Sequence, residues 1–72
     1  METKILDILK KIFELEFVSK DISQANCDKW DSMSHLNLVI ELESNFDIYL
    51  EPEEIAKMKS YAEIVRVVST KL

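Results

Sequence analysis

The chain has 72 residues, a formal net charge of −5 at pH 7, no glycine and one proline. This charge argues against nucleic acid as a partner, because its phosphates would be repelled, and suits docking on basic protein surfaces. One cysteine and one histidine exclude an internal disulfide and argue against a structural zinc site. Abundant Leu, Ile, Glu and Lys favour helices over tight turns, so we expect a single all-α domain over residues 1–72.

The first predicted element is an amphipathic helix over about residues 3 to 17, in which apolar residues recur at spacings of three and four. Its apolar face comprises Ile5, Leu6, Leu9, Ile12, Phe13 and one of Leu15 and Phe17. Residues 18 to 31 are mostly polar and predict a loop longer than most connections in compact domains, a kind of loop that is often functional. We expect Ile22 to anchor this loop to the core, and Trp30 either to pack against the loop or to contact a partner.

A second helix is predicted from Ser32 to about Phe46. Asp31 suits the N-cap, since its carboxylate can accept from the free N–H groups of the first turn. Ser32 then occupies the first helical position, with its hydroxyl pointing outward. A phosphate group on Ser32 would lie in the favourable field of the helix N-terminus, although the Asp31 carboxylate partly opposes it.

This second helix carries two apolar rows. The row expected in the core comprises Leu38, Val39, Leu42 and Phe46. The other row comprises Met33, Leu36 and Ile40. A bundle this small can hardly bury both rows, so we expect part of the second row to be open to solvent or to a partner. The alternative is that Met33 and Leu36 complete the core, as apolar rows usually do.

The rest of the chain predicts a connector, a short helix and a last helix. The connector covers residues 47–50, and Pro52 to Met58 forms the short helix, with glutamates near its positive end and Ile55 and Met58 turned inward. Ser60 and Glu63 form a predicted capping box ahead of the last helix. The core face of that helix comprises Ile64, Val67 and Val68. The predicted fold is therefore a small bundle of three main helices plus one short helix.

His35 and Cys27 have reactive side chains, so each needs an interpretation of its own. Asp31, Ser32 and His35 contain the residue types of a nucleophilic triad, but a chain without glycine cannot shape the tight nucleophile turn of a hydrolase. We therefore expect no catalysis, and interpret His35 as a polar surface residue beside Ser32 that can touch a phosphate or a partner. Cys27 is expected to be a small packed hydrophobe.

The run Trp30-Asp31-Ser32-Met33 resembles the attachment site of acyl carrier proteins, small helical bundles in which the serine of an Asp-Ser-Leu or Asp-Ser-Met motif carries 4′-phosphopantetheine. The resemblance extends over nearly the whole chain, from the first amphipathic helix through the long loop and the motif to the acidic segment 51–54 and the short last helix. It implies that a phosphopantetheinyl transferase attaches the group from coenzyme A to Ser32, with Asp31 and His35 beside it. Cargo would then be held as a thioester, loaded by an acyl- or aminoacyl-activating ligase and delivered to downstream acyltransferases or synthases.

The same resemblance implies a surface for partner enzymes around the second helix. The residues expected there are Trp30, Met33, Leu36, Asn37, Ile40, Glu41, Glu43, Glu53 and Glu54. The chain has Ser34, His35 and Asn37 where fatty-acid-synthase carriers often have acidic residues, so it looks closer to discrete stand-alone carriers. Those include D-alanyl carrier proteins and carriers for surface-polysaccharide or specialised-metabolite pathways.

The expected setting is a cytoplasmic monomer with a reduced thiol. No apolar run approaches the roughly 20 residues needed to span a bilayer, and the N-terminus lacks a signal-peptide core. We therefore expect no membrane insertion. The alternative function is an unmodified helical module that uses the same apolar row and acidic surface to bind a partner protein.

Overall fold

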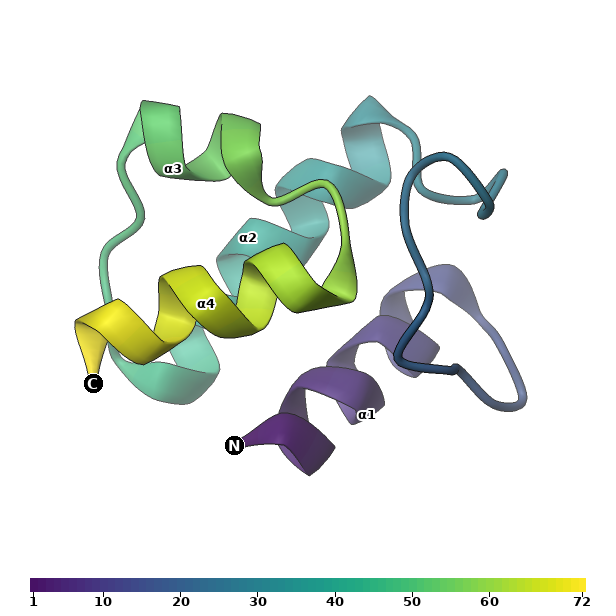
Figure 1. Ribbon diagram of the computed structural model, residues 1–72, viewed down its shortest axis with the longest axis horizontal. Helices are drawn as coiled ribbons and strands as arrows, with labels where there is room; N and C mark the ends of the chain where they lie inside the picture. Colours follow the sequence, from purple (N-terminus) through teal and green to yellow (C-terminus); the bar gives the residue numbers. More distant parts are fainter.

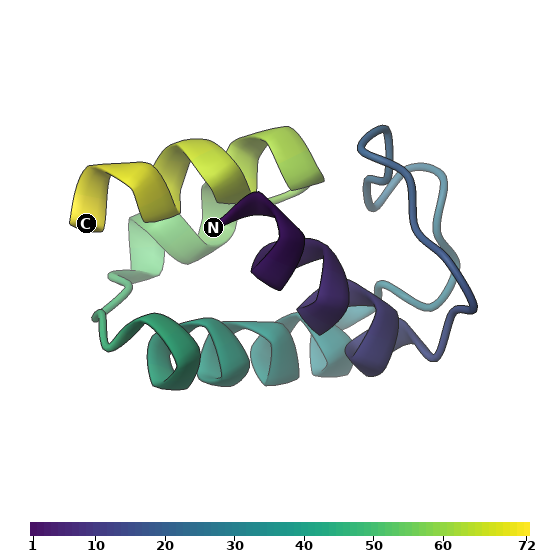
Figure 2. The same cartoon turned by 90° about the horizontal axis from the view of Figure 1, so that it is seen from below.

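The computed structural model describes residues 1–72 and contains four helices and no sheet (Figure 1). The helices are α1 Glu2–Phe13, α2 Ser32–Phe46, α3 Pro52–Lys57 and α4 Tyr61–Lys71. Helix α1 packs against both α2 and α4, and it crosses obliquely between them in Figure 2. The predicted bundle of three main helices and one short helix is confirmed. None of the four helices combines the length and the apolar character that crossing a bilayer would require.

The core consists entirely of hydrophobic side chains, and no polar or charged residue is buried. The core row of α2 is buried at Leu38, Val39 and Leu42, whereas Phe46 at its end is only half-buried. On α4 the predicted core face is confirmed, since Ile64, Val67 and Val68 are all buried. Met58 is also buried, and Ile55 packs against the core from the short helix α3. Helix periodicity therefore predicts which faces meet.

Helix α1 is shorter than its apolar pattern predicts. It ends at Phe13, because Glu14 adopts a left-handed conformation (φ 54°, ψ 47°) and donates its N–H to the Lys10 carbonyl. Of the two candidates for the end of the apolar face, Leu15 is half-buried against the core, whereas Phe17 lies beyond the helix and is 79% exposed. Glycine usually occupies this cap position. Because a glutamate stands here instead, the sequence does not mark where the helix ends.

The long loop between α1 and α2 is hydrogen-bonded to the α3–α4 connection and to the start of α4. Ile22 is buried, as predicted, and its carbonyl accepts from the Tyr61 N–H (3.0 Å) at the start of α4. The Gln24 N–H donates to the Lys59 carbonyl (2.9 Å). Trp30, at the end of the loop, is 4% exposed and packs on the Phe13 ring at a centroid distance of 5.1 Å. The loop is thus held in place at both of its apolar anchors.

The capping arrangements near α3 and α4 differ in part from the prediction. Ser60 Oγ accepts from the Glu63 N–H (3.2 Å), as expected for an N-cap serine. The return bond from the Glu63 side chain is not made, because that carboxylate pairs with Arg66 one turn later. A return bond is found instead at α3, where the Glu51 N–H donates to Glu54 Oε1 (2.9 Å).

Candidate functional site

Ser32 is exposed at the first position of α2, directly after an aspartate that caps the helix. Asp31 has extended backbone angles (φ −93°, ψ −176°), and its Oδ1 accepts from the Ser34 N–H (2.8 Å). This bond lowers the pKa of the Asp31 carboxyl, so the cap stays charged over a wider pH range. The predicted capping role of Asp31 and the predicted position of Ser32 at the helix start are both confirmed.

His35 is the fourth residue of α2 and is half-buried. The indole Nε1–H of Trp30 donates to His35 Nδ1 (2.9 Å), and His35 Nε2 lies 2.9 Å from the carbonyl oxygen of Ile55 on α3. An indole nitrogen can only donate and a carbonyl oxygen can only accept, so both bonds require a neutral ring with its proton on Nε2. His35 lies beside Ser32 and lines the same pocket, as expected, but it is half-buried and its ring is bonded to loop and α3 groups, which a surface residue would not be.

The same two bonds prevent His35 from acting as the base of a hydrolytic triad. With both ring nitrogens of His35 engaged by Trp30 and Ile55, no lone pair remains to accept a proton from Ser32. The Asp31 carboxylate is bonded to the Ser34 N–H and not to the imidazole. The three residues lie close in sequence but do not form the base-to-nucleophile geometry that catalysis needs.

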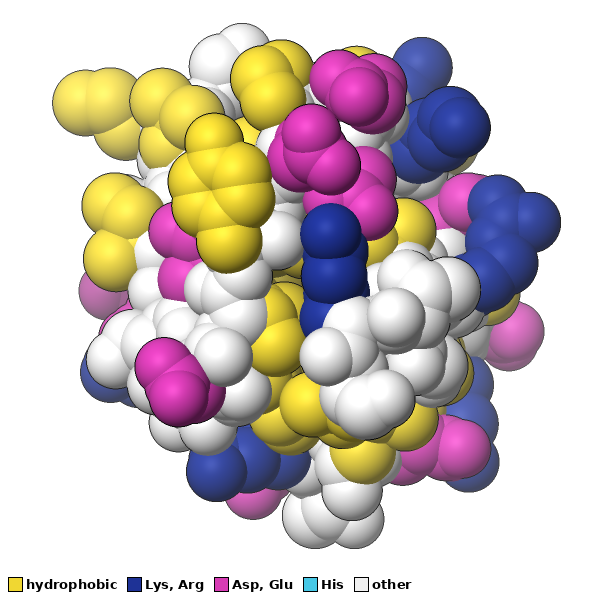
Figure 3. Space-filling model, turned by 90° about the vertical axis from the view of Figure 1, so that its left-hand side faces the viewer, with side chains coloured by type: hydrophobic (Ala, Val, Ile, Leu, Met, Phe, Trp, Pro, Cys, Tyr) yellow, Lys and Arg dark blue, Asp and Glu magenta, His cyan; other side chains and the backbone are white.

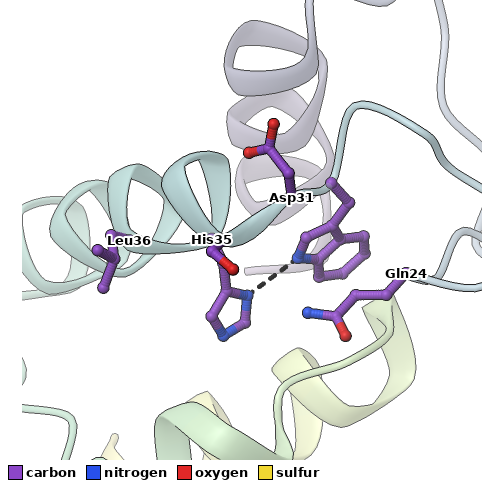
Figure 4. Close-up of a pocket in the computed structure, with 6 residues that line it drawn as sticks. Gln24, Asp31, His35 and Leu36 are labelled. Carbon is purple, nitrogen blue, oxygen red and sulfur yellow. Dashed lines mark hydrogen bonds between the residues drawn. The ribbon is translucent and has the colours of Figure 1, made fainter.

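A pocket of about 480 Å³ opens beside Ser32 (Figure 4). Its lining comprises Gln24, Trp30, Asp31, Ser32, His35 and Leu36. Figure 4 shows the Gln24 side chain directed toward the His35 ring, and the dashed line marks the hydrogen bond that His35 accepts from Trp30. Gln24 was missed in the sequence, since only the pairing of the long loop with the α3–α4 connection brings it here.

The second apolar row of α2 is open to solvent. Met33 is 73% exposed, Leu36 58% and Ile40 62%. The prediction that this row would not be fully buried is confirmed, and the alternative in which Met33 and Leu36 complete the core is wrong. Asn37 is exposed on the same helix, whereas Trp30 is buried and offers little surface to a partner.

The acidic residues around α2 and α3 have varied surroundings. Glu41 pairs with Lys11 of α1 (2.9 Å), and Glu43 Oε2 accepts from the Leu50 N–H (2.8 Å). Glu54 has a lowered pKa because it accepts from the Glu51 N–H and, next in importance, from the Lys71 side chain. Glu53 is exposed. On the face shown in Figure 3, which holds the α2–α3 connection, hydrophobic and acidic side chains lie beside one another.

Comparison with known proteins shows which proteins share this sequence pattern and fold. No family model matches the chain. An acyl carrier protein of Exiguobacterium sp. (strain ATCC BAA-1283 / AT1b) is 28% identical over 78 residues, covering 99% of this chain and 96% of that protein. The solution structure of a holo acyl carrier protein from Geobacter metallireducens superposes with a TM-score of 0.85 at 26% identity, over 97% of this chain and 83% of that one.

In sequence and in fold, the chain is similar to acyl carrier proteins over nearly its whole length. The crystal structure of an acyl carrier protein from Thermotoga maritima agrees, with a TM-score of 0.77 at 25% identity over 96% of this chain and 82% of that one. The family resemblance identified from the Asp31-Ser32-Met33 motif is thereby confirmed. Within this acyl carrier protein fold, the motif lies at the junction of the long loop and α2, beside the one pocket of the structure.

Proposed function

We propose that the chain is a non-catalytic carrier, formed by one domain over residues 1–72, whose Ser32 holds 4′-phosphopantetheine. The observation that carries this proposal is the exposed Ser32 hydroxyl at the first position of a capped helix in an acyl carrier protein fold. The site fits a phosphodiester, because the first-turn N–H groups of a helix favour an anion and the serine side chain is not enclosed. When bound, the group supplies a thiol on a flexible arm, on which an acyl or aminoacyl cargo is held as a thioester.

In the proposed attachment, the Ser32 hydroxyl oxygen attacks the coenzyme A phosphorus next to the pantetheine part. A new O–P bond forms, the pyrophosphate bond breaks, and adenosine 3′,5′-bisphosphate leaves. The proton of the hydroxyl must go to a base on the phosphopantetheinyl transferase, because His35 has both ring nitrogens engaged. Asp31 contributes by holding the first turn of α2 in shape for the transferase.

We further propose that partner enzymes dock on the exposed apolar row beside Ser32. Met33, Leu36 and Ile40 form one stripe along the helix and are all more than half exposed. An exposed apolar stripe rimmed by polar groups is typical of an interaction surface. The net charge of −5 would steer the chain toward basic partner surfaces, with Glu53 the most available of the glutamates on α3. The partners would be the transferase, an acyl- or aminoacyl-activating ligase, and downstream acyltransferases or synthases.

The pathway we propose is that of a discrete cytoplasmic carrier serving polysaccharide modification or specialised biosynthesis, with fatty-acid synthesis as the alternative. The first turn of α2 contains no acidic residue. Ser34, His35 and Asn37 stand where fatty-acid-synthase carriers often place acids, and this supports a different set of partner enzymes. The carrier would act as a monomer, handed from one enzyme to the next.

The decisive test is the intact mass of the protein after incubation with coenzyme A and a broad-specificity phosphopantetheinyl transferase. The parent should gain the mass of one phosphopantetheine. Ser44→Ala is the matched control, because Ser44 is an exposed serine on the same helix, and this variant should gain the same mass. Ser32→Ala should gain none. A folded parent that gains nothing would instead favour the unmodified interaction module.

A further inference from the structure

We propose that His35 is a positioning residue for the attachment reaction, one that fixes the first turn of α2 and thereby orients the Ser32 hydroxyl. This inference rests on the proposed carrier function. It assigns His35 an indirect role through Trp30 and Ile55, in place of direct contact with a phosphate. We call these three hydrogen-bonded residues the Trp30–His35–Ile55 relay.

The relay holds the chain on both sides of Ser32. Trp30 precedes Ser32 by two residues, His35 follows it by three, and one hydrogen bond of 2.9 Å joins their side chains. The second bond, also 2.9 Å, runs from His35 Nε2 to the Ile55 carbonyl, which lies 20 residues further along the chain on α3. A short segment that contains Ser32 is therefore closed into a loop and attached to a separate helix.

The far ends of the relay pack against hydrophobic side chains. The Trp30 ring is buried, packs on Phe13 of α1, and stacks on the His35 ring at a centroid distance of 6.3 Å and an interplanar angle of 27°. Ile55 packs against the core. The first turn of α2 is thus connected through one imidazole to α1 and to α3.

Ser32 needs such support because the first turn of a helix is its least constrained part. The first N–H groups of a helix have no partner within it, and helix ends open more readily than their middles. At this end the Asp31 cap supplies one bond to the Ser34 N–H. The relay supplies the only side-chain hydrogen bonds that connect this turn to other elements of the fold.

The test compares two substitutions of His35. In His35→Gln the side-chain amide offers one acceptor for the indole and one donor for the carbonyl, so it can restore the relay. In His35→Leu neither bond can form. Val65→Ala is the stability control, because Val65 is half-buried on α4 and has no part in the relay. All proteins are assayed at a temperature at which circular dichroism shows each of them to be folded.

Two readouts separate positioning from general stability. The chain has a single tryptophan, so its indole N–H gives one resonance in a proton–nitrogen correlation spectrum, and that signal reports the Trp30 bond directly. The second readout is kcat and KM for transfer of the arm from coenzyme A. Since docking depends on the exposed row and orientation on the relay, loss of the relay should act on kcat and leave KM within about twofold.

We expect His35→Leu to move the indole signal and to lower kcat about two- to tenfold, the range that one net hydrogen bond represents. His35→Gln should recover most of the rate, and Val65→Ala should change neither readout. A folded His35→Leu protein with the parent's kcat overturns this inference and leaves the carrier function standing. A parent that accepts no arm overturns both.

The coupling between the relay's members gives a second, independent measurement. Trp30→Phe keeps an aromatic ring against Phe13 but removes the indole donor. If the two residues act as one relay, the double variant Trp30→Phe/His35→Leu should lose no more kcat than His35→Leu alone. Losses that multiply would show that the residues act separately, and would overturn the relay.

Discussion

Two leucines on α2 test the assignment of its faces with one and the same substitution. Leu42 is fully buried, whereas Leu36 is 58% exposed in the row beside Ser32. Replacing either by alanine changes helix propensity equally, because both lie within the same helix. The difference in stability between Leu36→Ala and Leu42→Ala therefore isolates the contribution of burial.

The expected magnitudes are well separated. Truncating a fully buried leucine to alanine costs about 2–5 kcal/mol, from lost transfer free energy and the cavity left behind. A domain of this length has a total stability of about 4–11 kcal/mol, so Leu42→Ala removes a large part of it. Leu36 loses little buried area, and we expect a cost of about 1 kcal/mol or less. Since each kcal/mol lowers Tm by about 4–8 °C in a domain this small, Leu42→Ala should melt at least about 8 °C below the parent.

Thermal unfolding followed by circular dichroism measures both effects, and the arm-transfer assay should rank the variants in the opposite order. Leu36→Ala should lower kcat/KM by removing part of the docking row. Leu42→Ala, assayed cold enough to stay folded, should transfer like the parent. Equal losses of Tm in the two variants would refute the assignment of the faces, and a normal kcat/KM in Leu36→Ala would refute the docking row.

Two further predictions concern polar contacts. The pKa of Asp31 is lowered, chiefly by the Ser34 N–H, so the stability from its charge is present above its ordinary pKa of about 3.9 and is lost as pH falls through the lowered value. Asn at position 31 caps without titrating, so the Tm advantage of the parent over Asp31→Asn should shrink between about pH 5 and pH 2; a constant gap would contradict this. Glu43→Ala leaves the Leu50 N–H without its partner and should cost about 1–3 kcal/mol in urea unfolding, whereas Glu43→Gln keeps an acceptor and should cost less; equal costs would contradict the bond.

The helix that carries Ser32 could be predicted closely because independent signals agree there. Asp31 and Ser32 mark its start by cap chemistry, and its apolar period separates a core row from an exposed one. The end of α1 could not be predicted in the same way. Its apolar pattern continues to Phe17, and the residue that stops the helix is a glutamate in a left-handed conformation that sequence patterns assign to glycine.

Polar residues that bond across the fold were the least predictable. His35 lies three residues after a serine and four after an aspartate, and this spacing suggests either a triad or an exposed side chain. Its actual partners are an indole and a backbone carbonyl on another helix, and neither is encoded by local spacing. Gln24 and Glu43 are likewise positioned by distant backbone groups. The Gln24 N–H bonds to the Lys59 carbonyl, and the Glu43 carboxylate accepts from the Leu50 N–H after the end of α2.

These polar contacts share one structural task, which is to hold α3. This helix has only six residues and none of them is buried, so apolar packing alone secures it weakly. His35 bonds the Ile55 carbonyl, Glu43 bonds the Leu50 N–H just before α3, and Lys71 pairs with Glu54 from α4. The face of α2 that meets α3 therefore uses its polar side chains internally, and the face with Met33, Leu36 and Ile40 makes no such bond. That division explains how a helix with two apolar rows can keep one of them free for partner enzymes without loosening the bundle.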